Sequence, residues 1–361
     1  MRKLPSLKIG RLEINPPFIL GGMGVRITNY SLTAAVANLG MAGTIASVGL
    51  CDRKTKSEQY ASASNAALIK EIRSARKLTN GGIGVNIMAA LTNYEELART
   101  AAKENVDYII VGAGLPLDLP RLTKGSTAAL IPIVSSVRAA EIIMKKWQNK
   151  YNRLPDAFIV EGALAGGHLG YNLKEIAVWN KNSLANLCKG IMSLCKAVEK
   201  KTGHHIPVIA AGGLYDGEDI AKMLKIGVEG VQLATRFIAT DECSVPDKIK
   251  QALIKAKKDD LVIINSPVGM PGRVLKNKFV KRILRGEKIK VDCPYHCLKT
   301  CIPETAPFCI AEALVNAYEG DFDNGIIMPG SNAYKIKEIV PVKELVDTLV
   351  NETVHYLNLK E

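Results

Sequence analysis

The sequence of 361 residues lacks the marks of several protein classes. No apolar run reaches the roughly 18–20 residues that cross a bilayer, so no membrane partner is expected. The N-terminus shows no apolar core followed by a small-residue cleavage site, and we expect no signal peptide. Eight cysteines without an export signal argue against a disulfide framework. These absences together predict a cytoplasmic protein.

Aromatic residues are also scarce, at 5% of the chain, and they do not interleave with basic residues in any patch. The formal net charge is +13, yet the lysines are scattered, and the denser stretches 196–201 and 276–290 carry apolar residues at helical spacing. No nucleic-acid module is present, so we expect no nucleic-acid partner. A solvated basic surface explains the charge, with attraction of anionic substrates or acidic carriers as the weaker alternative.

Short apolar runs alternate with amphipathic, helix-like segments across the first 240 residues. This alternation predicts a parallel (β/α)8 TIM barrel. A doubly wound sheet is the alternative, but it predicts one dominant glycine loop early in the chain, whereas the glycine loops here come late. The eight runs lie at 18–20, 42–46, 83–87, 108–111, 130–134, 157–160, 207–211 and 230–233.

The regular alternation stops after Phe237. We therefore assign residues 1–240 to the barrel and residues 241–305 to a small α-rich second domain over the C-terminal face of the barrel. Residues 306–361 return to amphipathic helices, which are expected to pack back on the barrel.

Chemistry in such barrels sits at the C-terminal ends of the strands, and phosphate groups bind after strands seven and eight. Here these ends carry Gly212-Gly213 and Gln232-Leu233-Ala234-Thr235. Backbone amides of Gly213, Ala234 and Thr235 are suited to phosphate oxygens, with the Thr235 hydroxyl as a further donor. The alternative, that the glycines only tighten turns, is less favoured because both loops fall where the architecture predicts the site.

A single histidine, His168, follows the sixth run within a glycine-rich stretch that includes Gly166 and Gly167. Glycines leave the imidazole few neighbours, which argues against a core histidine and favours an acid, base or hydrogen-bond donor beside a ligand. Asn86, at the end of the third run, has the donor and acceptor of a carboxamide for a heterocycle edge, although a helix cap is an equal alternative. Gly22-Met23-Gly24 permits close approach of the backbone to a ligand.

Six motifs, in order, resemble those of the nitronate monooxygenase family of FMN-dependent barrel enzymes, and flavin-dependent enoyl-acyl-carrier-protein reductases share them. The resemblance runs from about residue 15 to 285, and 272–277 (GRVLKN) resembles the small-domain signature of the family. The motifs are GGMG at 21–24, GVNIM at 84–88, VGAGLP at 111–116, VEGALAGGHLG at 160–170, PVIAAGGLYDG at 207–217 and GVQLATRF at 230–237.

The resemblance implies FMN as cofactor and His168 as the catalytic residue. Two positions depart from the family. Glu161 stands where the monooxygenases usually have glutamine, which would alter hydrogen bonding at the flavin edge, and Ala234 stands where many relatives have glycine. The flavin contacts that the resemblance implies fall on the Met23 backbone, Asn86, Glu161, Gly166, Gly213, Gln232, Leu233, Ala234 and Thr235.

The activity that the resemblance implies is oxidation of alkyl nitronates, a small-molecule substrate, by molecular oxygen. The alternative is an NAD(P)H-dependent reductase of an enoyl thioester or another acceptor, with NAD(P)H as reductant and an acyl carrier protein as partner. The sequence leaves open whether the protein forms a homodimer. A flavin-binding subunit without turnover is a third hypothesis, against which the histidine argues.

Four cysteines form a C-x3-C-x3-C-x7-C array, Cys293, Cys297, Cys301 and Cys309, with a histidine beside the second. Such an array is compatible with zinc or an iron–sulfur cluster. Its spacings match no standard metal motif, and the nearby prolines indicate loop thiols. The sequence therefore favours reduced cysteines packed under the small domain, with no metal.

Overall fold

Eight parallel strands form a closed ring in the computed structural model, which describes residues 4–52, 55–180, 182–293 and 295–358. The hydrogen-bonded order is β3-β11-β10-β8-β7-β6-β5-β4, and a parallel bridge between Ile19 and Ala42 joins the two end strands. This confirms the predicted barrel and excludes a doubly wound sheet. The strands are β3 (Phe18–Leu20), β4 (Gly43–Ala46), β5 (Ile83–Met88), β6 (Tyr108–Gly112), β7 (Ala129–Val134), β8 (Phe158–Glu161), β10 (Val208–Ala211) and β11 (Gly230–Leu233).

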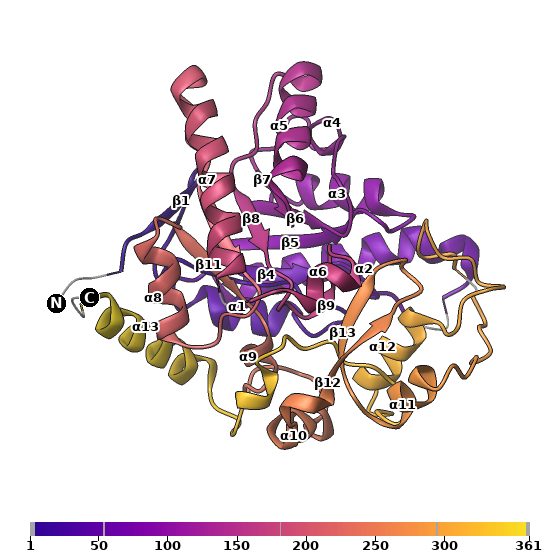
Figure 1. The fold of residues 1–361 in the computed structure, drawn as a ribbon. Helices are drawn as coiled ribbons and strands as arrows, with labels where there is room; N and C mark the ends of the chain where they lie inside the picture. Colours follow the sequence, from indigo (N-terminus) through magenta and orange to yellow (C-terminus); the bar gives the residue numbers. More distant parts are fainter. Residues whose placement is uncertain (1–3, 53–54, 181, 294, 359–361) are drawn as a thin grey trace.

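Helices surround the ring (Figure 1) and begin at the capping signals that the sequence carries. Asn29 accepts hydrogen bonds from the Ser31 and Leu32 amides at the start of α1, and Ser136 caps α5 in the same way. Within the described residues, no helix has the length and apolar character needed to cross a bilayer. The helices that follow barrel strands are α1 (Tyr30–Ala37), α2 (Tyr60–Leu78), α3 (Tyr94–Lys103), α4 (Leu119–Leu122), α5 (Val137–Tyr151), α6 (Leu173–Ala177), α7 (Ser183–Thr202), α8 (Gly217–Lys225) and α9 (Thr235–Ile238).

The interior of the ring is filled by apolar side chains, so the barrel is a packed core rather than a channel. Tyr108 lies fully buried there, and its hydroxyl donates to the Gly43 carbonyl at 2.6 Å and pairs with the Thr44 hydroxyl at 2.9 Å. A Cβ on Gly84 would lie 2.1 Å from the Tyr108 ring, so the ring needs a glycine opposite it. The N-terminal hairpin of β1 (Leu7–Ile9) and β2 (Leu12–Ile14) contributes Leu7, Ile9 and Ile14 to the same cluster.

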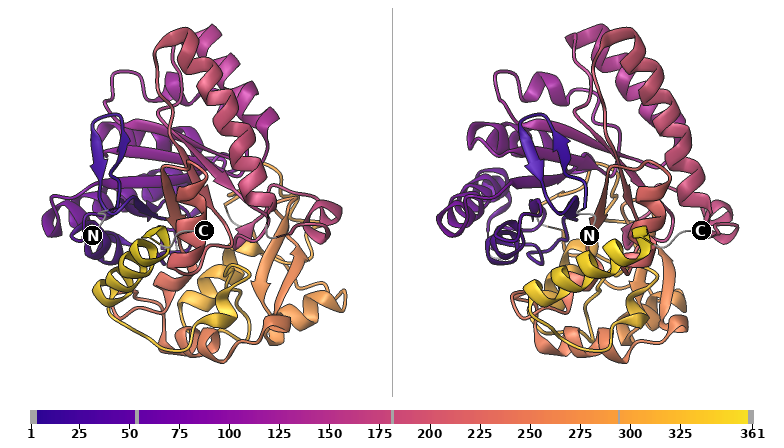
Figure 2. Two further views of the ribbon diagram at one scale, coloured as in Figure 1. Left: turned by 60° about the vertical axis from the view of Figure 1, so that its left-hand side comes forward. Right: turned by 90° about the vertical axis from the view of Figure 1, so that its left-hand side faces the viewer.

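The C-terminal third lies together on one side of the barrel (Figures 1 and 2). It holds α10 (Asp247–Lys255), β12 (Leu261–Asn265), β13 (Pro271–Leu275), α11 (Lys278–Leu284), α12 (Ile310–Tyr318) and α13 (Val342–Asn358), with short 3-10 turns at Lys258–Asp260 and Ala333–Lys335. A further 3-10 turn, Ser57–Gln59, precedes α2. Helix α13 packs on α8, where the Gly217 amide donates to the Glu352 carboxylate at 2.8 Å.

The second domain contains a sheet as well as helices, which the prediction of an α-rich domain missed. Strands β12 and β13 pair antiparallel, and β13 pairs in turn with β9 (Gly167–His168), which belongs to the loop after β8. A two-residue strand formed by segments about a hundred residues apart leaves no periodic pattern in the sequence.

Replacement of Tyr108 by phenylalanine should lower the free energy of unfolding by about 1–3 kcal/mol, because two buried polar partners lose their hydrogen bond. Tyr94→Phe is the matched control: this tyrosine is also buried, but its hydroxyl makes no hydrogen bond within the described structure. Loss of the Tyr94 hydroxyl should lower the free energy of unfolding by less than about 0.5 kcal/mol, or raise it. Urea unfolding of both variants measures the difference, and equal losses would contradict the assigned role of the Tyr108 hydroxyl.

Candidate functional site

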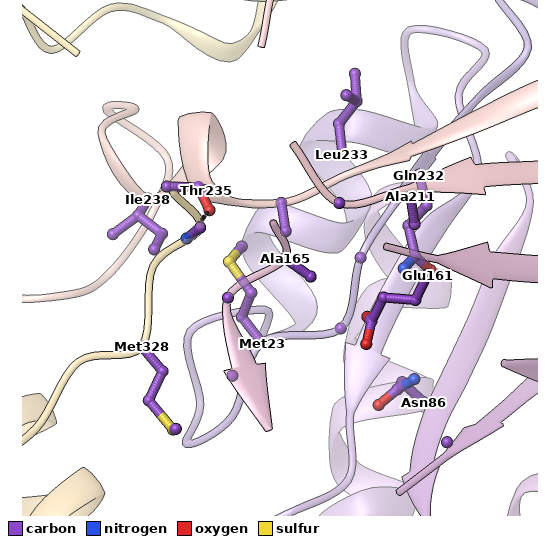
Figure 3. Close-up of a pocket in the computed structure, with 18 of the residues that line it drawn as sticks. Met23, Asn86, Glu161, Ala165, Ala211, Gln232, Leu233, Thr235, Ile238 and Met328 are labelled. Carbon is purple, nitrogen blue, oxygen red and sulfur yellow. Dashed lines mark hydrogen bonds between the residues drawn. The ribbon is translucent and has the colours of Figure 1, made fainter. Parts of the chain in front are cut away.

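A cavity of about 260 Å³ opens at the C-terminal ends of the barrel strands. The structure brings every sequence-predicted site residue to its lining (Figure 3). These residues come from the ends of five barrel strands, β3, β5, β8, β10 and β11, or from the loops behind them: Gly22, Met23, Gly24, Asn86, Glu161, Gly166, Gly167, His168, Gly212, Gly213, Gln232, Leu233, Ala234 and Thr235. Their common location supports one ligand site and leaves the role of each residue to be argued from its surroundings.

Asn86 and Glu161 point into the same part of the cavity from β5 and β8 (Figure 3). A Cβ on Gly22 would lie 2.4 Å from Asn86 Cβ, so the glycine lets the N-terminal loop pass beside the carboxamide. Burial raises the pKa of the Glu161 carboxyl to about 7. At neutral pH this side chain is therefore present both as the acid, which donates a hydrogen bond, and as the carboxylate, which only accepts.

His168 is held between the barrel and the second domain. It lies on β9, opposite Gly272 of β13, rather than on a free loop as the sequence suggested. Its Nε2 lies 2.7 Å from the Ser266 hydroxyl, which fixes the direction of the ring. Burial lowers the pKa of the imidazole to about 4, so it is neutral at pH 7 and able to accept a proton.

Arg273 lies outside the cavity lining but supports it, and the sequence analysis included it only as part of the motif at 272–277. Its side chain is buried, and Nη1 donates to the Ala163 carbonyl at 2.7 Å and to the Ala165 carbonyl at 2.5 Å. Burial lowers its pKa to about 10, so the guanidinium stays charged at pH 7. This cation holds the loop between β8 and β9 in place.

The two glycines after β10 adopt backbone conformations that side chains disfavour. Gly212 has φ +90° and Gly213 has φ +88°, and a Cβ on Gly213 would lie 2.8 Å from Leu164 Cβ. Glycine is therefore needed here both for the backbone angle and for space. The Gly213 carbonyl accepts from Asn332 at 2.7 Å, so the loop is also fixed from the C-terminal segment.

The segment before α13 completes the cavity, which the sequence analysis missed. Gly330 donates its amide to the Thr235 hydroxyl at 2.9 Å, and Met328 lines the cavity across from Met23 (Figure 3). The only local signal was the Met328-Pro329-Gly330-Ser331-Asn332 turn. Its meeting with Thr235 depends on how the chain returns to the barrel.

Two polar atoms in the cavity lining lack partners within the described structure. Gln232 Oε1 and Ser331 Oγ are buried without a hydrogen bond. A buried polar atom without a partner costs about 1–3 kcal/mol, so such atoms indicate a ligand that satisfies them. The cavity thus combines a glycine cradle, unsatisfied polar groups and one neutral imidazole.

A family model of nitronate monooxygenase matches residues 5–352. The chain belongs to the nitronate monooxygenase family. This assigns it to a family of oxidoreductases and agrees with the barrel and with the position of the cavity at the strand ends.

Three relatives illustrate the range of the family. The chain is 28% identical over 279 residues to a (3aS,4S,5R,7aS)-5-hydroxy-7a-methyl-1-oxo-octahydro-1H-indene-4-carboxyl-CoA dehydrogenase of Mycobacterium tuberculosis, covering 77% of this chain and 68% of that protein. It is 28% identical over 320 residues to a probable nitronate monooxygenase of Staphylococcus aureus, covering 78% and 81%. The structure of FabK from Thermotoga maritima superposes with a TM-score of 0.72 at 29% identity, covering 94% and 93%.

The lowered pKa of His168 predicts a loss of stability in acid. Because the folded state favours the neutral ring, this contribution is complete above pH 6.5 and is lost as pH falls toward 4. Relative to His168→Gln, the ligand-free wild-type protein should lose up to about 3 kcal/mol between pH 7 and pH 4. Urea unfolding across this range measures the difference.

His205→Gln is the control of opposite sign. Hydrogen bonds to Glu229 and Glu199 raise the pKa of His205, so its contribution is present in acid and lost as pH rises. A wild-type profile parallel to that of His168→Gln would contradict burial of a neutral His168.

Proposed function

We propose that this protein binds FMN in the cavity and oxidises alkyl nitronates with molecular oxygen. One observation carries the proposal: a neutral, oriented imidazole lines the same cavity as a cradle of two glycines with positive φ angles. A phosphate fits the cradle and an oxidisable small molecule fits the space beside the imidazole. Family membership and the similarity to the probable nitronate monooxygenase of Staphylococcus aureus support it.

The residues present suit FMN. Backbone amides of Gly213, Ala234 and Thr235 would hold the phosphate, and Gln232 Oε1, which has no partner among the described residues, would accept from a ring N–H. Asn86 and Glu161 would pair with the polar edge of the ring. Bound there, FMN supplies the electron-transfer chemistry that amino-acid side chains lack.

His168 acts on protons. When the substrate enters as the neutral nitroalkane, the imidazole accepts the α-proton, which its neutral state at pH 7 allows. When the substrate is already a nitronate, the same ring donates a hydrogen bond to a nitro oxygen. The hydrogen bond to Ser266 keeps the His168 ring in one orientation for both roles. Arg273 holds the loop that leads to His168.

The similarity to FabK favours a second function, reduction of an enoyl thioester by NAD(P)H. The net charge of +13 suits an acidic acyl carrier protein as partner, although a basic surface attracts many other anionic molecules as well. Under either function we infer a cytoplasmic enzyme, since all eight cysteines are unpaired, as in a reducing compartment. A homodimer is compatible with both functions.

Anaerobic stopped-flow mixing separates the two activities. We expect an alkyl nitronate to bleach the bound flavin, and NADH and NADPH to leave it oxidised. Fast bleaching by NADH or NADPH, followed by reoxidation with a crotonyl thioester, would instead establish the reductase. In His168→Ala, turnover of the neutral nitroalkane should fall on the order of 10²–10⁴-fold, because the proton acceptor is gone.

Turnover of the preformed nitronate by His168→Ala should fall much less, because its proton has already left. His204→Ala is the control, since that ring bonds to the Pro155 carbonyl and does not line the cavity. Equal losses on both substrates would refute the role of His168 as a base.

Gly213→Ala should weaken FMN binding by at least about 10-fold, because the added Cβ meets Leu164 and the φ angle is unfavourable. Gly286→Ala is the matched control: Gly286 has φ +81°, and its added Cβ would have no neighbour within 4 Å. Both variants should lose about 1–2 kcal/mol of stability, and only Gly213→Ala should lose affinity in a flavin fluorescence titration. An unchanged FMN affinity in Gly213→Ala would contradict the proposal that this loop binds the phosphate.

A further inference from the structure

Four cysteines outside the lining of the flavin cavity surround a second, small cavity. Its lining includes Cys293, Cys297, Cys301 and Cys309, and about 10 Å³ of its interior is open to the centre of a water-sized sphere. All four are unpaired thiols in the loop between α11 and α12, which runs along the outside of the second domain (Figure 1). The sequence favoured reduced cysteines packed under the small domain, and the fold brings the four of them to one cavity.

The cysteine loop is fastened to the barrel although its described part contains no helix or strand. Cys297 accepts a backbone hydrogen bond from Thr92 at 3.1 Å, and the Lys299 amide donates to Ala90 at 2.9 Å. Tyr295 stacks on Tyr60 of α2 with ring centroids 4.8 Å apart. Loops longer than about 12–15 residues without regular structure are uncommon unless they bind something or are disordered, and this loop spans residues 285–309.

The cysteine spacing favours an iron–sulfur cluster over zinc. Structural zinc sites usually take two pairs of ligands from two turns, whereas the cysteines of iron–sulfur proteins occur as a close group of three with a more distant fourth. Here Cys293, Cys297 and Cys301 follow one another at intervals of four residues. The fourth, Cys309, comes after seven intervening residues. Across the described residues, no group of three or more His, Cys, Asp or Glu is spaced for a single metal ion, and a cluster of several irons needs ligands farther apart.

We propose that Cys293, Cys297, Cys301 and Cys309 hold an iron–sulfur cluster of the [4Fe–4S] type, with one thiolate on each iron. Each thiol loses its proton as its sulfur–iron bond forms. The site lies beside the flavin cavity, because Thr92 and Ala90, which bind the cysteine loop, follow directly after β5 and its Asn86. The proposal does not depend on which substrate the flavin cavity takes.

The test is metal analysis of the full-length protein, purified without oxygen and, where needed, reconstituted with ferrous iron and sulfide. We expect about four iron atoms and four acid-labile sulfides per chain, and an electron paramagnetic resonance signal after reduction with dithionite. Cys301→Ala and Cys309→Ala should each lower bound iron several-fold. Cys195→Ala, a buried cysteine of α7, should keep the full content.

Flavin content of each variant shows whether the barrel has folded, and analysis of the wild-type protein decides the matter even if a variant fails to fold. One zinc per chain without sulfide would overturn the proposal in favour of a zinc–thiolate site. Four titratable thiols at these positions and no metal after reconstitution would overturn it altogether.

Discussion

The pairing of β9 with β13 sets the position of the His168 imidazole. His168 belongs to the barrel by sequence, but its backbone is hydrogen-bonded to the second domain, and Ser266 of that domain orients its ring. Arg273, on the same strand β13, carries a buried charge whose Nη1 donates to two carbonyls of the loop that leads to His168. A guanidinium buried in this way is stabilised only while both carbonyls stay in place, so the loop and the second domain hold each other.

Burial then gives the cavity its chemical character. Desolvation disfavours charge, which lowers the pKa of His168 and raises that of Glu161. Both groups are thereby moved toward their neutral forms, an uncharged imidazole and a carboxyl that donates a hydrogen bond. Such a lining suits an anionic ligand with a polar ring edge better than two charged side chains would. The departure from glutamine at Glu161 is therefore partly offset, since a protonated carboxyl has a donor and an acceptor, as an amide does.

The relatives span more than one oxidoreductase chemistry on one scaffold, so the family alone does not choose the substrate. Leu314 and the segment around Met328, which line the cavity together with His168, belong to the layer outside the barrel. The cysteine loop belongs to this same outer layer. The barrel supplies the glycine-rich part of the cavity lining, while the elements that follow it in the chain supply Leu314 and Met328.

The amino-acid sequence by itself determined the local features: eight strands with helices between them, the glycine loops after β10 and β11, and His168 with its glycines. Each depends on periodicity or on a backbone angle that only glycine adopts readily, and both are properties of neighbouring residues. Only the tertiary structure decided that β9 pairs with β13, that Gly330 and Asn332 reach Thr235 and Gly213, and that four cysteines share one cavity. Those contacts join segments far apart in the chain, and their free energy comes from burial and pairing that exist only once the barrel has closed.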